Sequence, residues 1–177
     1  MGQKHGVWFD LSTHLAIHND VIKKFSWLIQ SGDTEYKISN LNEKGQDKVK
    51  HSISFESTNG YLINITKETL ISSLDPESAM TVYFSYNCLS LKGDYHLRYH
   101  SAHSPVYNPN APWHDKPHRH EFDGKKKVID IYSHDHRPKK DQFNKYTWKG
   151  YPVTLTFLEN EDWPFVKEFL EEVSYLK

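Results

Sequence analysis

Apolar residues recur at helical spacing near each end of the chain. Near the N-terminus, one helical face would be formed by Val21, Ile22, Phe25, Leu28 and Ile29. This spacing predicts a helix from about Asn19 to Ser31, capped by Asn19 or Asp20 and ended by Gly32. Near the other end, Asp162 and Pro164 precede a second stripe, made of Val166, Phe169, Leu170, Val173 and Leu176. A capping aspartate, a proline in the first turn and an apolar face predict a C-terminal helix there.

Between these helices, apolar and polar residues alternate in the manner of β-strands. The strand-like stretches are residues 51–57, 61–66, 81–91, 94–102, 118–122, 127–136 and a last strand or hairpin over 146–159. Thr58-Asn59-Gly60 and Lys92-Gly93 are short Gly-containing connections typical of hairpins. The polar stretch 67–80 is expected to be a connection. The predicted fold class is α+β: a single domain over residues 1–177, with an antiparallel sheet of six or seven strands and one N-terminal and one C-terminal helix.

Composition excludes several classes of protein. The chain has 177 residues, of which 14% are aromatic, and aromatic residues are depleted in disordered proteins. Its apolar runs are too short for a membrane span, and His and Asp interrupt the N-terminal stretch where a signal peptide is apolar. The single cysteine, Cys88, excludes internal disulfides and sites built from several cysteines. We therefore expect a cytoplasmic protein without a membrane segment.

Charge and histidine concentrate in residues 92–149. This segment holds 12 lysines and arginines against 7 acidic residues, a balance of +5, whereas the net charge of the whole chain is −1. It also holds eight of the 12 histidines. Cations track phosphates and aromatic rings stack on bases, so a basic, aromatic and histidine-rich segment suits RNA as a partner. The alternative interpretation is a solvated basic loop beside acidic neighbours.

Strand alternation predicts which of these residues share a face. In residues 94–102, the core side is assigned to Tyr95, Leu97 and Tyr99, and the opposite side to His96, Arg98 and His100. In residues 118–122, His118 and His120 point together, away from Arg119. In residues 127–136, the polar side carries Tyr132 and His134, with His136 in line. Three strands are thus expected to present imidazoles, an arginine and a tyrosine on one polar face.

The first chemistry that fits this set is metal-free cleavage of RNA. One imidazole removes the proton of the 2′-hydroxyl, a second protonates the leaving oxygen, and a cation stabilises the phosphorane. We assign His100 and His120 as the acid/base pair and His118 as a further catalytic residue. The residues expected to bind substrate are Arg98, Arg119, His96, Tyr132 and Lys126. No cofactor is expected for this mechanism.

A metal site is the second chemistry. Two H-x-H pairs on strands, His118 with His120 and His134 with His136, have the geometry of histidine ligation to zinc or another divalent transition metal. The arginines beside them would repel a dication, which favours the metal-free alternative. A third possibility is a non-catalytic module that binds nucleic acid or protein through the same basic segment. His5, His14, His18 and His51, outside the segment, are interpreted as incidental surface residues.

The middle segment also resembles a known family. Tyr99-His100, Asn110-Ala111-Pro112 and Pro117-His118-Arg119-His120 are similar to the core signature of the small TumE-type toxins and related His-rich proteins. The resemblance covers some 30 residues. It implies a growth-inhibiting protein that acts on RNA or translation and is neutralised by a cognate antitoxin, a minor nucleotidyltransferase. The Arg98-x4-His103 spacing also occurs in HEPN ribonucleases, but those carry it on a helix, whereas a strand is predicted here.

Overall fold

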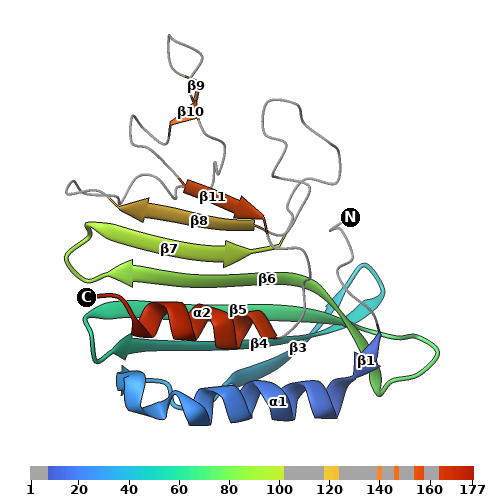
Figure 1. Ribbon diagram of the computed structural model, residues 1–177. Coiled ribbons are helices and arrows are strands. Elements are labelled where there is room, and N and C mark those ends of the chain that lie inside the picture. The colour runs from blue at the N-terminus through green and yellow to red at the C-terminus, as the bar shows by residue number, and fades with distance from the viewer. Residues whose placement is uncertain (1–7, 102–117, 124–138, 141–145, 148–153, 158–163) are drawn as a thin grey trace.

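The computed structural model describes residues 8–101, 118–123, 139–140, 146–147, 154–157 and 164–177. Over these residues, a large antiparallel sheet is covered on one face by two helices, one from each end of the sequence (Figure 1). The predicted α+β class, with a helix near each end of the chain, is confirmed. In this part of the chain, each helix is too short or too polar to cross a membrane.

The helices are α1 (Leu11–Lys24) and α2 (Pro164–Ser174), and a 3₁₀ turn, η1, covers Ser26–Leu28. The strands of the large sheet are β1 (Phe9–Asp10), β2 (Ile29–Gly32), β3 (Lys37–Glu43), β4 (Gln46–Ser57), β5 (Tyr61–Ile71), β6 (Ser78–Ser90), β7 (Tyr95–His100), β8 (His118–Asp123) and β11 (Thr154–Phe157). A separate two-stranded pair is formed by β9 (Lys139–Lys140) and β10 (Tyr146–Thr147).

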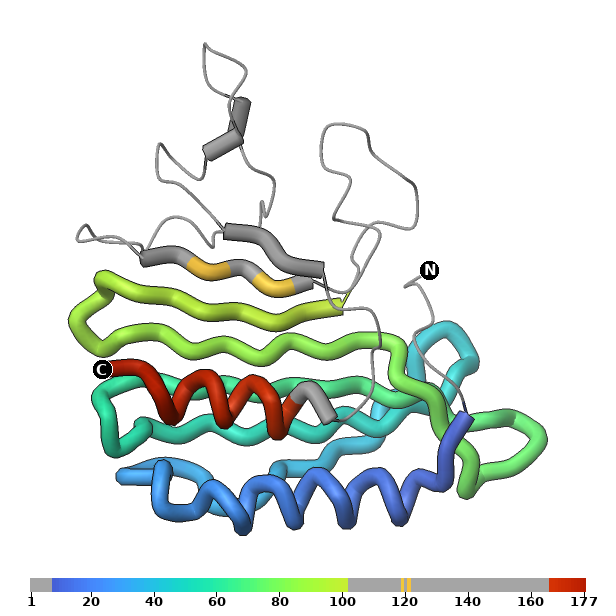
Figure 2. The backbone as a smooth tube through the Cα atoms, in the orientation of Figure 1, coloured from blue at the N-terminus to red at the C-terminus, as the bar shows by residue number. Residues whose placement is uncertain are grey.

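Seven strands follow one another across the large sheet in the order β11-β8-β7-β6-β5-β4-β2. The strands β4 to β8 are neighbours both in space and in sequence, so they form a meander, whose path Figure 2 traces. In addition, β1 pairs with the start of β6, and β3 pairs with β4. The predicted hairpins at 58–60 and 92–93 are confirmed, because they join β4 to β5 and β6 to β7.

Alternate residues of β4 to β7 face the helices and form the core. The buried members on the sheet are Ile53, Phe55, Tyr61, Ile63, Ile65, Phe84, Tyr86, Cys88, Leu97 and Tyr99. The stripe predicted for α2 is confirmed, because Val166, Phe169, Leu170 and Val173 are all 0% exposed. Phe169 packs against the rings of Tyr86 and Tyr99, with centroid distances of 5.8 and 5.4 Å. The core therefore lies between α2 and the central strands.

Asn59, in the β4–β5 turn, fastens the end of α2. Its side-chain amide donates to the carbonyl oxygens of Val173 at 2.9 Å and Leu176 at 3.1 Å. The last carbonyls of a helix have no partner within it, so an external donor stabilises this end. The Tyr61 hydroxyl adds a hydrogen bond to the carbonyl oxygen of Lys177 at 3.1 Å.

The N-terminal helix begins earlier than predicted. It starts at Leu11, and Asp10 is its N-cap, accepting from the backbone N–H of Thr13 at 2.7 Å. The predicted start at Asn19 is eight residues too late, because α1 buries His14 and His18 ahead of that point and these residues give no apolar stripe. The expected stop at Gly32 was wrong as well, since Gly32 lies in β2. Its φ is +109°, and a β-carbon there would lie 2.8 Å from the Cα of Phe55.

The polar stretch 67–80 was wrongly predicted to be a connection. Strand β5 continues to Ile71 and β6 begins at Ser78, so most of the stretch pairs within the sheet. Lys67 and Thr69 are both 0% exposed. Burial of polar residues under α1 removed the alternation that the sequence prediction relies on.

Candidate functional site

Strand β7 places its two sets of side chains as alternation predicts. Leu97 and Tyr99 lie in the helix-covered core, at 0% and 6% exposure. His96, Arg98 and His100 alternate with them and therefore belong to the other face of the sheet.

The pairing of β7 with β8 brings the predicted site positions together. Arg98 lies opposite His120, and His100 lies opposite His118. Residues directly opposite in an antiparallel pair are close neighbours on one face. The backbone register therefore sets these four positions side by side, while the side chains of His118 and His120 lie outside the described part of the structure.

The two cross-strand pairs, Arg98 with His120 and His100 with His118, each continue as a row of residues over the neighbouring strands. One row consists of Ser54, Asn64, Asn87, Arg98 and His120, and the other of Ser52, Thr66, Ser85, His100 and His118. We call these ten positions the polar band. Neighbouring strands lie about 4.8 Å apart, so five strands extend the band over about 19 Å. The band lies on the face opposite the helices.

Hydrogen bonds fix several side chains of the band. The Arg98 guanidinium donates to the Ser85 hydroxyl through Nη2 at 3.3 Å, and the Asn87 amide donates to the same hydroxyl at 2.9 Å. Farther along, the Ser54 hydroxyl donates to the Asn64 carbonyl oxygen at 2.7 Å. Arg98 is therefore held on β7, near the β8 end of the band, with part of its side chain exposed.

Two of the predicted histidines are less accessible than expected. His100 is 1% exposed and His96 is 6% exposed, so neither imidazole lies open to solvent, as direct contact with a substrate would require. His96 also lies outside the polar band, in a row with Leu62 and Leu89. Alternation predicts which face a residue takes, but not whether that face is covered at a given position.

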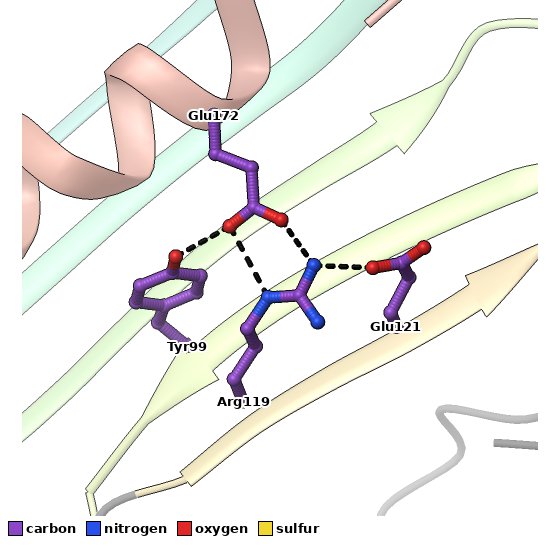
Figure 3. Close-up of polar contacts among 4 residues, drawn as sticks. All are labelled: Tyr99, Arg119, Glu121 and Glu172. Atoms are coloured by element: carbon purple, nitrogen blue, oxygen red, sulfur yellow. Dashed lines mark hydrogen bonds and ion pairs between the residues drawn. The ribbon is translucent and has the colours of Figure 1, made fainter. Parts of the chain in front are cut away.

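Arg119 lies on the helix-covered face, where its guanidinium forms ion pairs with two carboxylates. Its guanidinium binds Glu172 of α2 and Glu121 of β8, and the hydroxyl of Tyr99 donates to Glu172 (Figure 3). The Arg119 Nε to Glu172 distance is 3.1 Å, and the arginine side chain is 14% exposed. Burial, and then the hydrogen bond to Glu172, raise the pKa of Tyr99. We therefore assign Arg119 to holding α2 on β7 and β8, in place of the predicted phosphate contact.

Other predicted residues lie outside the described residues. These are Tyr132 and Lys126, expected to bind substrate, and His134 and His136, half of the alternative metal set. For those positions, the sequence-based hypotheses stay predictions.

The structure reveals a second group of histidines, between α1 and the sheet. His14 and His18 lie one turn apart on α1, and His51 lies on β4; their exposed fractions are 2%, 1% and 0%. One imidazole nitrogen of each lies within 4.8 Å of the others. We call these three residues the histidine cluster. Their interpretation as incidental surface residues was wrong.

Aromatic rings enclose the histidine cluster. Phe9 stacks on His14 with ring centroids 4.0 Å apart. Tyr36 meets His18 and His51 edge-on, at centroid distances of 5.7 and 5.3 Å, and its own hydroxyl is buried. The cluster is therefore closed to solvent and bordered by aromatic rings.

This environment keeps the imidazoles neutral. Burial, followed by the charge of Lys67, lowers the pKa of His51 to about 3 and lowers those of His14 and His18 as well. Lys67 lies directly opposite His51 on β5 and is 0% exposed. Neutral imidazoles have a lone pair available for a metal or a hydrogen-bond donor.

The sequence did contain a signal for the histidine cluster. His14 and His18 are separated by three residues, the spacing that puts two imidazoles on one helix face. His51 lies between Val49 and Ile53 on the same, inward side of β4. The signal was missed because the helix was predicted to start after both helical histidines.

A cavity of about 290 Å³ is present elsewhere among the described residues. It is lined by Trp8, Gly45, Gln46, Asp47, Leu70, Ile71, Ser72, Ser73 and Leu74. None of the predicted site residues and none of the histidine cluster lines it.

Comparisons of this chain with protein-family models, with curated proteins and with solved structures found no match.

Proposed function

We propose that the protein is a small RNA-directed hydrolase that binds single-stranded RNA along the polar band and cleaves it with histidines, without a metal. The observation that carries the proposal is the strand register, which sets Arg98 beside position 120 and His100 beside position 118 at one end of the band. The basic segment 92–149 contains β7 and β8 and supports phosphate binding through its charge.

The acid/base roles fall on His118 and His120. Residues two apart on a strand lie about 7 Å from one another, which allows two imidazoles to flank one phosphate. One accepts the proton of the 2′-hydroxyl as its oxygen attacks phosphorus, and the other protonates the 5′-oxygen as the P–O bond breaks. Imidazoles suit both steps because their ordinary pKa lies near neutral pH.

Arg98 and His100 have supporting roles in this proposal. Arg98 is partly exposed and held by Ser85, so its guanidinium is positioned to stabilise negative charge on the phosphorane. His100 is too buried to reach a substrate, and we assign it to positioning His118, its cross-strand neighbour. This assignment replaces the initial pair of His100 and His120.

The test is cleavage of a fluorescent single-stranded RNA, with a matched DNA as the control substrate. DNA should survive because it lacks the attacking 2′-hydroxyl. His118→Ala and His120→Ala should each lower the rate by about 10²- to 10⁴-fold, with RNA affinity nearly unchanged. His100→Gln should lower kcat and shift the pH profile of the reaction, which a purely structural role would not do.

Lys92→Gln is the matched control for Arg98→Gln. Both changes remove one positive charge from the basic segment, but Lys92 is exposed in the β6–β7 turn. Arg98→Gln should reduce both cleavage and the salt dependence of binding, whereas Lys92→Gln should leave cleavage within about twofold. Equal effects of the two variants, equal cleavage of DNA and RNA, or binding without cleavage would each contradict the proposal.

The biological role we propose is that of a toxin or defence effector with a cognate antitoxin. This rests on the resemblance of residues 99–120 to TumE-type toxins. Induced expression should arrest growth, and His120→Ala should relieve the arrest at equal protein level. Growth arrest that persists in His118→Ala and His120→Ala would contradict a role through RNA cleavage.

A further inference from the structure

We propose that His14, His18 and His51 bind one divalent transition-metal ion of the zinc class, which holds residues 11–18 of α1 on the sheet. This inference goes beyond the proposed RNA chemistry and does not depend on it. The histidine cluster lies between α1 and the sheet, whereas the polar band lies on the opposite face of the sheet.

The donor set fits such an ion. Three neutral imidazoles on two rigid elements converge, with one nitrogen of each within 4.8 Å of the others. Zinc–nitrogen bonds are about 2.0–2.1 Å, so two nitrogens on one tetrahedral zinc lie about 3.4 Å apart. Side-chain rotations that move each nitrogen by about 1 Å close this difference. Imidazole ligands suit zinc, copper, nickel and iron, and cobalt serves as a probe.

Unsatisfied nitrogen atoms are the second, independent observation. Among the described residues, neither ring nitrogen of His14, His18 or His51 has a hydrogen-bond partner, although all three side chains are at least 98% buried. Buried polar groups are almost always paired. A metal ion would engage a lone pair on each imidazole at once, which explains why three such rings gather here.

The location indicates a structural ion. The buried residues of α1 are His14, His18, Val21 and Ile22, so from its start to His18 the helix buries histidines alone. An ion shared with His51 would join residues 11–18 of α1 to β4. The three side chains are closed to solvent, whereas a catalytic zinc needs a coordination position that a substrate can reach, so the burial of the cluster favours a structural role.

Lys67 gives the proposal a sharp test. Its charge lowers the pKa of all three imidazoles, and the same charge opposes a bound cation. Lys67→Met should therefore raise metal affinity. If the cluster instead held an anion, through imidazole N–H groups and Lys67, then Lys67→Met would abolish binding of that anion.

The first experiment measures metal in the full chain. Protein purified without chelator should contain about one zinc-class ion per chain by elemental analysis. After stripping, Co²⁺ should bind with the visible absorption of a low-symmetry nitrogen site, and its affinity should fall more than about 100-fold in His18→Leu and His51→Leu. His96→Gln, which changes another buried histidine, is the matched control and should keep full metal content.

The second experiment separates metal loss from misfolding. In the metal-free state, His18→Leu should melt at or above the temperature of the original protein, because leucine leaves no unpaired polar atoms. Amide exchange over residues 11–18 should slow when metal is added to the original protein and stay unchanged in His18→Leu. Failure of the folded original protein to bind a zinc-class ion, equal binding in His18→Leu, or weaker binding in Lys67→Met would overturn the proposal.

Discussion

Glu172 is the residue whose replacement tests the packing of α2 most sharply. Its carboxylate accepts from the Tyr99 hydroxyl and binds the Arg119 guanidinium, joining α2 to β7 and β8 (Figure 3). In Glu172→Gln the side chain keeps its shape and loses its charge. Arg119 would then retain one carboxylate partner, Glu121.

The magnitude follows from burial. The side chains of Arg119 and Glu172 are 14% and 28% exposed, so solvent screens their attraction only in part. Breaking a fully buried pair costs about 3–5 kcal/mol. Because Glu121 remains and the amide oxygen still accepts a hydrogen bond, we expect Glu172→Gln to lower the free energy of unfolding by about 1–3 kcal/mol. For a chain of this length, the melting temperature should fall by about 3–10 °C.

The assay is urea unfolding followed by circular dichroism, with Glu171→Gln as the matched control. Glu171 lies one residue earlier on α2, and its pair with Lys167 is 3.6 Å long and about half exposed. Such a surface pair contributes less than about 0.5 kcal/mol. If the two variants unfold within about 0.5 kcal/mol of each other, the Tyr99–Glu172–Arg119 network does not stabilise the fold and the reasoning is refuted.

Three further predictions concern single positions. Gly32→Ala should cost about 2–4 kcal/mol in urea unfolding, because φ is +109° and the new β-carbon would meet the backbone of Phe55 at 2.8 Å; an unchanged midpoint would contradict this. Asn59→Ala should cost about 1–2 kcal/mol by removing the amide that caps α2, and faster amide exchange should be confined to the end of that helix. The pKa of Tyr99 is raised in the folded state, so the unfolded state ionises first and stability falls as pH rises above about 10; Tyr99→Phe should lose less stability between pH 9 and 11 than the original protein, and parallel losses would contradict the burial of this hydroxyl.

The helices show how far the sequence predicts this fold. For α2, the helix begins at the predicted proline, Pro164, and Val166 and Phe169 lie fully buried as the apolar stripe predicts, while the proposed capping residue Asp162 lies outside the described residues. For α1, the buried face begins with His14 and His18, and an apolar pattern cannot detect a helix that buries histidine. In β5, Lys67 likewise interrupted the apolar pattern, because the sequence does not distinguish a buried lysine from an exposed one. The strand was therefore predicted to end too early.

The candidate site shows a similar limit. Alternation predicted that His96, Arg98 and His100 share a face, but the pairing of β7 with β8 depends on long-range register. Without that register, the continuation of the row from Arg98 to Asn64 could not be predicted. The burial of His100 depends on tertiary packing and is invisible to a pattern of period two.

The most direct test of the central claim, metal-free RNA cleavage by histidines, is the chemical nature of the product ends. Mass spectrometry of the fragments from a short RNA identifies them. Attack by the 2′-oxygen predicts a 2′,3′-cyclic phosphate on one fragment and a 5′-hydroxyl on the other, formed at the same rate with and without added metal. Fragments ending in a 3′-hydroxyl and a 5′-phosphate would require attack by water instead of the 2′-oxygen, and would contradict the account.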